Sequence, residues 1–385
     1  MTDSRSLLSL PPFSERLAIC AAKDAAAYFR FQDAIFCRSE DLGAYKKIKE
    51  LGGAGEKTVC YECPKTAFNS PLIVPFDKKK IAAIMPGENV RHLSKSIKSG
   101  DNELIALLTD YDLSSVFAER DVELGVFGKT ITSRRLPEKV FVALDMPHST
   151  KRGLFADAFC SAASAIIALA ELRLGALIGF GADKELDERL CDIISRLISA
   201  KVGEETDAVF HAQALYAKLV YDRPEVFCGD ARVAAKILKK SGVSASLAEC
   251  EYSAAKALLK IYSIVCESLS ANNVLFPKTC ERLDRLTALF GAEEDAFTKD
   301  FRVFDEPAVY KAMSALCGGA SAKKICRDLS ERVAMLDRVY ARIYGGRKKR
   351  ATVSERTMAQ AIGACGLLSE GVLKFLSDGG VLDLL

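Results

Sequence analysis

The chain has 385 residues, of which 49% are hydrophobic and 27% are charged. This composition excludes an intrinsically disordered protein, and the length favours two domains because a single core stops growing near about 250–300 residues. The 54 basic and 51 acidic residues leave a net charge of +3, which gives no general field for binding nucleic acid or an anionic membrane. Thirteen cysteines without framework spacing indicate free thiols and a cytoplasmic protein.

Residues 1–148 alternate between β-rich runs and helical runs. Strands that alternate with helices are typical of a parallel sheet, so this part is predicted to be a Rossmann-like α/β domain with a mostly parallel sheet. The β-rich runs are "DAIFC", "TVCYEC", "PLIVP", "KIAAIM", "ELIALLT", "ELGVFG" and "KVFVAL".

Residues 149–385 contain almost no β-rich runs. Segments such as "ERLCDIISRLISAKV" and "LAECEYSAAKALLKIYSIVCESL" carry apolar residues at helical spacing, which predicts an all-helical domain. The longest apolar run, "SAIIALAELRLGALIGF", is interrupted by Glu171 and Arg173. It is therefore predicted to be a buried helix and not a membrane span.

Cys60 and Cys63 form a C-x-x-C motif in "VCYEC". A structural zinc site needs a second cysteine pair or nearby histidines, and the nearest histidine is His92. We expect two thiols on one face of a buried strand, with metal binding or redox cycling as the alternative.

The segment 136–171, "LPEKVFVALDMPHSTKRGLFADAFCSAASAIIALAE", resembles the domain junction of the metal-dependent alcohol and polyol dehydrogenases. This superfamily includes dehydroquinate synthase and glycerol-1-phosphate dehydrogenase, and the resemblance is nearest to the latter branch. It implies a dehydroquinate synthase-like fold, in which Asp145 ends a strand and Asp157 is a metal ligand on the first long helix. His148, in the interdomain loop, could act as a general acid or base. From the residues alone, Asp157 is equally a first-turn acid that offsets the helix dipole.

The resemblance also places the dinucleotide-binding loop at "LLTDYDLSS", residues 107–115. Family members bind NAD(P) there through three glycines and a serine, so Thr109, Asp110 and Ser114 are the matching candidates. Glycine allows close approach to the pyrophosphate, whereas Asp110 and Asp112 would each repel it by about 4 kcal/mol at ~4 Å and a dielectric of roughly 20. This argues against ordinary dinucleotide binding. The alternative role for the two aspartates is a helix N-cap and a loop acid.

The family's metal is held by one aspartate and two histidines, and the two histidine positions fall on or near Arg232 and Glu249. Guanidinium has no lone pair to offer a divalent metal. Glu249 could ligate a hard ion, but it also follows Ser246 at the spacing of a capping box, which we favour. An ion pair of Arg232 with Asp157 would stand where the metal was. His211 is the last of this chain's three histidines. It lies in an apolar helix and is expected to be a core residue.

Three functional hypotheses remain open at this point. The chain is a divergent member whose metal- and NAD-dependent activity is lost or altered, an active NAD(P)-dependent oxidoreductase acting on a polyol phosphate, or a non-catalytic protein-interaction module. A small-molecule ligand in the interdomain cleft is expected, and an exposed sheet edge suggests a homodimer. The basic run "YGGRKKRAT", residues 344–352, is expected to be a solvated loop and not a nucleic-acid site.

Overall fold

The computed structural model describes residues 8–63, 79–97, 102–125, 128–143, 145–146, 151–201, 204–269, 306–344, 353–378 and 382. The chain forms two compact units. The sheet unit comprises Met1–Arg120, Ser133–Ala162 and Lys201–Pro224, and the helical unit comprises Asp121–Thr132, Ala163–Ala200 and Glu225–Leu385.

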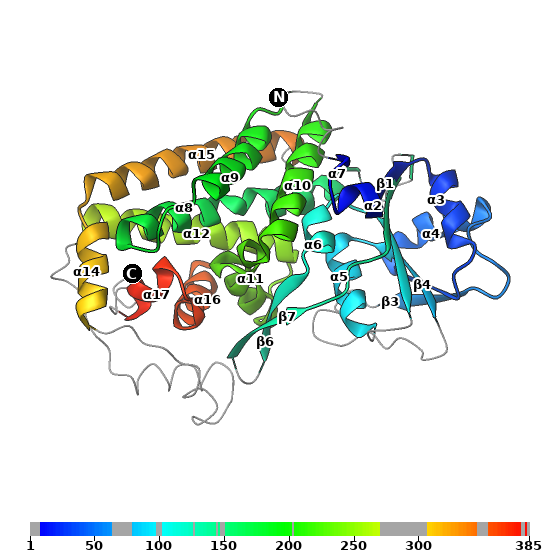
Figure 1. The fold of residues 1–385 in the computed structure, drawn as a ribbon, viewed down its shortest axis with the longest axis horizontal. Coiled ribbons are helices and arrows are strands. Elements are labelled where there is room, and N and C mark those ends of the chain that lie inside the picture. Colours follow the sequence, from blue (N-terminus) through cyan, green and yellow to red (C-terminus); the bar gives the residue numbers. More distant parts are fainter. Residues whose placement is uncertain are drawn as a thin grey trace. The chain divides into compact units, whose positions relative to one another are not determined.

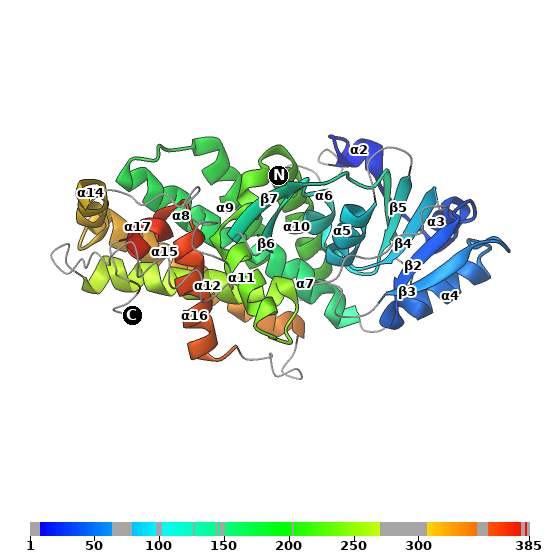
Figure 2. The ribbon, with the colours of Figure 1, turned by 90° about the horizontal axis from the view of Figure 1, so that it is seen from below.

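The sheet unit is built on a six-stranded sheet with the order β1-β8-β5-β4-β2-β3, in which every neighbouring pair is parallel (Figures 1 and 2). The predicted parallel α/β sheet is confirmed. The first strand was not predicted, and the run "PLIVP" lies outside the described residues. The strands are β1 (Leu17–Cys20), β2 (Ala34–Arg38), β3 (Val59–Cys63), β4 (Lys80–Met85), β5 (Glu103–Leu108) and β8 (Lys139–Ala143).

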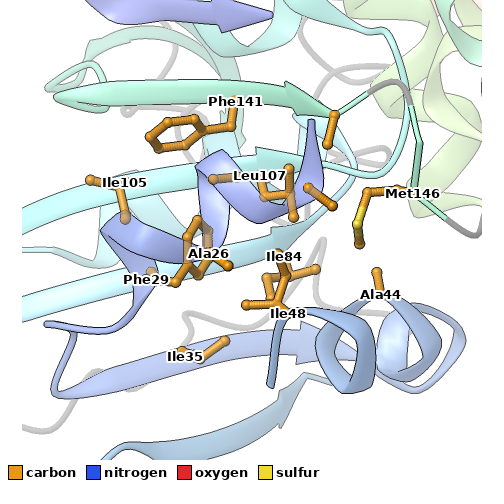
Figure 3. Close-up of a cluster of buried hydrophobic side chains, with 14 of the residues drawn as sticks. Ala26, Phe29, Ile35, Ala44, Ile48, Ile84, Ile105, Leu107, Phe141 and Met146 are labelled. Atoms are coloured by element: carbon orange, nitrogen blue, oxygen red, sulfur yellow. The ribbon is translucent and has the colours of Figure 1, made fainter. Parts of the chain in front are cut away.

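The central strands read as nearly continuous apolar runs because helices cover a parallel sheet on both faces. On one face, α3 (Ala22–Phe29) and α4 (Leu42–Glu50) pack against the strands and form a continuous core (Figure 3). The side chains labelled in this core are Ala26, Phe29, Ile35, Ala44, Ile48, Ile84, Ile105, Leu107, Phe141 and Met146. The other helices of the unit are α2 (Phe13–Arg16), α5 (Gly87–Ser96), α6 (Leu113–Phe117), α7 (Lys151–Ala163) and α10 (Glu205–Asp222).

The helical unit confirms the predicted helix-rich second part. Its main helices are α8 (Ala165–Ile178), α9 (Lys184–Ile198), α11 (Asp230–Lys240), α12 (Leu247–Ser268), α14 (Glu306–Leu316), α15 (Ala320–Tyr344), α16 (Glu355–Leu368) and α17 (Val372–Asp378). The segment Ala156–Ile178 is long and apolar enough to cross a membrane by length and composition, but 61% of its most apolar window is buried inside the protein. It is a core segment, as the sequence predicted.

A two-stranded hairpin also belongs to the helical unit. It consists of β6 (Arg120–Gly125) and β7 (Gly128–Ser133), and two lysines of α11 close the outer side of β6. The ammonium of Lys236 donates to the carbonyl of Val122, and that of Lys240 donates to the carbonyl of Leu124. Carbonyls that a third strand would otherwise bind are thus satisfied by side chains.

The compact units differ from the expected division at residues 148 and 149. Helices α7 and α10 complete the sheet unit, whereas the β6–β7 hairpin lies with the helices. Every described element from Lys151 onward is a helix, as predicted, and the two strands of the helical unit come from residues before that point. Sequence pattern locates elements along the chain, but packing decides which elements share a core.

Candidate functional site

Two aspartates, Asp110 and Asp112, hold the loop that follows β5, in the roles predicted from the sequence. Asp112 is the N-cap of α6, and its carboxylate accepts hydrogen bonds from the amide of Ser115 at 3.1 Å and the hydroxyl of Ser114 at 2.8 Å. The carboxylate of Asp110 accepts from the amides of Gly87 at 2.9 Å and Asp112 at 3.3 Å. The N-cap and loop-acid roles are confirmed.

A second layer of hydrogen bonds closes over the start of α6. The amide of Ser114 donates to the side-chain oxygen of Gln213 at 3.2 Å, and the hydroxyls of Ser114 and Ser161 lie 2.7 Å apart. The side-chain nitrogen of Gln213 donates in turn to the carbonyl of Ala158. Since residues 104–118 are all buried, the helix amides that would receive a pyrophosphate are already bound to protein oxygens.

Gly87, the first residue of α5, faces this loop at very short range. A Cβ atom on Gly87 would lie 2.2 Å from the carbonyl oxygen of Asp112. Because Gly87 has no side chain, the start of α5 can approach the backbone of Asp112, and this contact lies within the sheet unit. No local pattern indicated this role, because Gly87 lies 25 residues before Asp112 in the chain.

The loop carboxyls are shifted toward the protonated state. Burial raises the pKa of Asp110 well above its ordinary value, and the charges of Asp112 and Asp157 raise it further. Burial likewise raises the pKa of Asp112, against the hydrogen bonds from Ser115 and Ser114 that lower it. Asp157 is therefore within electrostatic reach of Asp110, inside the sheet unit.

Asp157 is the seventh residue of α7 and is half-buried. It lies beyond the first helical turn, so the expectation of a first-turn acid is wrong: the helix begins at Lys151, earlier than the apolar pattern indicated. Asp145 is exposed and accepts the amide of Ala22 at 2.6 Å, which satisfies a free donor at the start of α3. His148 lies outside the described residues.

Arg232 lies in the interior of the helical unit with 2% of its surface exposed. Its guanidinium donates to Glu251 at 2.9 Å and to Asp121 at 3.4 Å, and it stacks on the ring of Phe227 at 4.3 Å. Lys236 also donates to Asp121. We call Arg232, Lys236, Asp121 and Glu251 the Arg232 network.

Two carboxylates of the helical unit, Glu251 and Asp121, bind Arg232. The expected ion pair of Arg232 with Asp157 stays a prediction. Glu251 also accepts the hydroxyl of Ser164 at 3.1 Å. Two cations and two anions balance one another, and each carboxylate has hydrogen-bond donors, which is the condition for burying such charges.

Glu249 turns away from this network and caps its own helix. The amide of Glu249 donates to the hydroxyl of Ser246, and the carboxylate of Glu249 accepts the amide of Ser246, both at 3.1 Å. The capping box is confirmed. The residue with a buried carboxylate is Glu251, two positions later, which the sequence did not single out.

The residues at the expected metal position do not fit a divalent metal. A guanidinium occupies one ligand position, and the carboxylate of Glu249 is engaged at the helix end. Within the part of the chain that the structure describes, no group of three histidine, cysteine or acidic side chains is arranged to hold a metal ion.

The two histidines that the structure describes add no ligand to the site. Burial lowers the pKa of His92 to about 4, although Glu88 beside it acts in the opposite direction, so its imidazole is neutral. His211 is half-buried on α10. The basic run at 345–352 lies outside the described residues.

No family model matches the sequence, and no curated protein matches it significantly. Solved structures do resemble it. An archaeal halo-thermophilic alcohol dehydrogenase from a Red Sea brine pool aligns with a TM-score of 0.52 at 12% identity, over 95% of this chain and 93% of that one. A variant of that enzyme gives 0.50 at 12% identity, over 92% and 91% of the two chains. Glycerol dehydrogenase from Schizosaccharomyces pombe gives 0.45 at 12% identity, over 88% and 94%. The two alignments at TM-scores of 0.52 and 0.50 show that the chain has the fold of this archaeal alcohol dehydrogenase.

Proposed function

We propose that this chain has the dehydrogenase fold without the metal- and NAD-dependent dehydrogenase reaction. The observation that carries the proposal is the Arg232 network. A guanidinium buried between two carboxylates neutralises, with Lys236, the acidic groups that would otherwise attract a cation. A metal entering there would have to displace Arg232 and leave its charge buried without a partner, which costs several kcal/mol.

The start of α6 supports the same proposal. A dinucleotide phosphate needs free amide donors and no facing negative charge, whereas the amides of Ser114 and Ser115 are bound to Gln213 and Asp112. Binding would require these internal hydrogen bonds to break. Each buried donor or acceptor left without a partner costs about 1–3 kcal/mol.

What remains for function is binding. We propose that the protein takes a small organic ligand that needs neither metal nor dinucleotide, acts in the cytoplasm and forms a homodimer. A role purely in protein interaction is the alternative when ligand screens give no hit. An active NAD(P)-dependent oxidoreductase on a polyol phosphate is the competing hypothesis, and the half-buried acid Asp157 is the feature that favours it.

The test uses the full chain after treatment with a chelator. NAD(H) and NADP(H) are titrated calorimetrically with and without added zinc, and bound zinc, iron and nickel are measured by elemental analysis. We expect flat titrations and no stoichiometric metal, both in the native sequence and in Asp157→Ala. One equivalent of metal that disappears in Asp157→Ala, or micromolar cofactor binding that zinc strengthens, would establish the oxidoreductase instead.

A further inference from the structure

Two cysteines from different strands of the sheet unit lie in contact. Cys37 is on β2 and Cys60 is on the neighbouring parallel strand β3, and their sulfur atoms are 3.5 Å apart. In the strand register Cys37 pairs with Glu62 and Ile35 pairs with Cys60, so the two cysteines are diagonal neighbours on one face of the sheet.

The C-x-x-C motif is not the cysteine pair that the fold brings together. Successive residues of a strand point to opposite faces, so Cys60 and Cys63, three positions apart on β3, project to opposite sides. The expectation of two thiols on one face of the strand is therefore wrong. The motif's first cysteine has its partner on β2, 23 residues earlier in the chain.

The two members of the pair differ in access to solvent. Cys37 is fully buried, whereas Cys60 is half-buried on β3, at one end of the strand order of the sheet. The hydrogen bond from Cys37 lowers the pKa of Cys60 to about 7, against burial, with further lowering from Tyr45 and Lys49. The same hydrogen bond and burial raise the pKa of Cys37. The accessible sulfur of Cys60 is thus the one that loses its proton more readily, and the buried sulfur of Cys37 holds its proton more strongly.

We propose that Cys37 and Cys60 form a reversible disulfide when the protein meets a peroxide. The thiolate of Cys60 attacks one oxygen of hydrogen peroxide, which gives a sulfenic acid on Cys60 and releases hydroxide. The sulfur of Cys37 then attacks the sulfenic sulfur, so that the S–S bond forms and water leaves with the Cys37 proton. Two electrons pass from the two thiols to the peroxide, and a dithiol reductant returns them.

The second step requires only a small movement of the two sulfur atoms. An S–S bond is about 2.05 Å long, so the sulfur atoms have to approach by roughly 1.5 Å from their contact distance. Among the strands that the structure describes, β3 has β2 as its one neighbour, and a strand held on one side can adjust more readily than a central one. The bond would tie β3 to β2 across the segment that contains α4.

The experiment exposes the reduced full-length protein to hydrogen peroxide, blocks the remaining thiols with N-ethylmaleimide, and identifies linked peptides by mass spectrometry. We expect a Cys37–Cys60 linkage that dithiothreitol removes. In Cys37→Ser the sulfenic acid of Cys60 has no second thiol and is expected to be captured by dimedone. Cys60→Ser should give neither product, and Cys63→Ser should leave the linkage unchanged.

The chain supplies a matched control in a second cysteine pair. Cys266 on α12 and Cys326 on α15 have sulfur atoms 3.8 Å apart, but both side chains are buried. At a peroxide dose that links Cys37 to Cys60, this pair is expected to stay reduced. The proposal fails when the native protein shows no Cys37–Cys60 linkage, when Cys60 links to Cys63 instead, or when the buried pair oxidises as fast.

Discussion

Arg232 and Glu251 bind each other across 2.9 Å inside the helical unit, from neighbouring helices α11 and α12. Each of the two residues has only 2% of its surface exposed. A buried ion pair of this kind adds little net stability over an apolar substitute, but removing one partner leaves the other charge buried without compensation. Loss of either Arg232 or Glu251 is therefore expected to destabilise the helical unit.

Replacing Arg232 with Met is expected to destabilise the protein by about 3–5 kcal/mol, because Glu251 is left buried without its cation. The double variant Arg232→Met with Glu251→Met should recover part of this loss. Urea denaturation measures both. Arg196→Met is the matched control, since the Arg196–Asp192 pair is partly exposed and should cost no more than about 1 kcal/mol. Equal losses in Arg232→Met and Arg196→Met would contradict the buried-pair account.

Gly87→Ala is expected to be strongly destabilising, because its Cβ would lie 2.2 Å from the carbonyl oxygen of Asp112. Overpacking of this kind costs about 1–3 kcal/mol or more. Gly43→Ala in α4 serves as the control, since nothing lies within 4 Å of its added Cβ. That variant should be neutral or more stable by up to ~1 kcal/mol, owing to helix propensity. Thermal unfolding of the two variants side by side decides the matter, and a harmless Gly87→Ala would disprove the close approach.

Ser246→Ala is expected to lower stability by about 1 kcal/mol, since it removes the acceptor for the amide of Glu249 at the start of α12. Glu249→Gln should be milder, because glutamine can still accept the amide of Ser246. Metal content should not change in either variant. A metal equivalent lost specifically in Glu249→Gln would show instead that Glu249 is a ligand.

A half-buried carboxyl, Glu171, and a buried one, Asp230, give a pH prediction for the helical unit. Burial raises the pKa of Glu171 well above its ordinary value, and the charge of Asp230 raises it further. Burial also raises the pKa of Asp230, against the hydrogen bond from Ser369. With folded pKa values above the unfolded values near ~4, the native state binds more protons. This contribution is complete at low pH and is lost as pH rises through the folded pKa values.

Glu171→Gln, which cannot ionise, should therefore flatten the loss of thermal stability on the alkaline side. Unfolding midpoints measured between about pH 5 and 9 test this. Asp187→Asn provides the opposite case, because the hydrogen bond from Arg173 lowers the pKa of Asp187. Its stabilisation is lost as pH falls, so Asp187→Asn should flatten the acidic side only. An unchanged alkaline slope in Glu171→Gln would refute the assignment.

Local patterns predicted local structure well. The spacing of Ser246 and Glu249 predicted the capping box, and Asp112 before an apolar run predicted a helix N-cap, because both motifs depend on atoms within one helical turn. The alternation of strand-like and helical runs also predicted the parallel sheet, since parallel strands need crossover connections that are usually helices.

Contacts between distant segments were not predictable in this way. Glu251 is one of three acidic residues in the mostly apolar helix α12, and nothing in the neighbouring sequence indicates that it binds Arg232. Gln213 and Ser161 look like ordinary helix residues, yet they close the start of α6. The partner of Cys60 was missed because the motif suggested Cys63, whereas strand pairing supplied Cys37. The sequence feature that could have indicated each of these contacts is a polar or sulfur-bearing residue on an otherwise apolar face.

The interleaving of the two units has a consequence for synthesis on the ribosome. The sheet unit is complete only after Lys201–Pro224 has emerged, because Gln213 from that segment closes the hydrogen bonds at Ser114. Nascent chains released at residue 148 would therefore carry the strands without α7 and α10, and would expose the surface of α6 against which α10 packs. Translation stalled between the two points should yield a species that chaperones hold and proteases degrade.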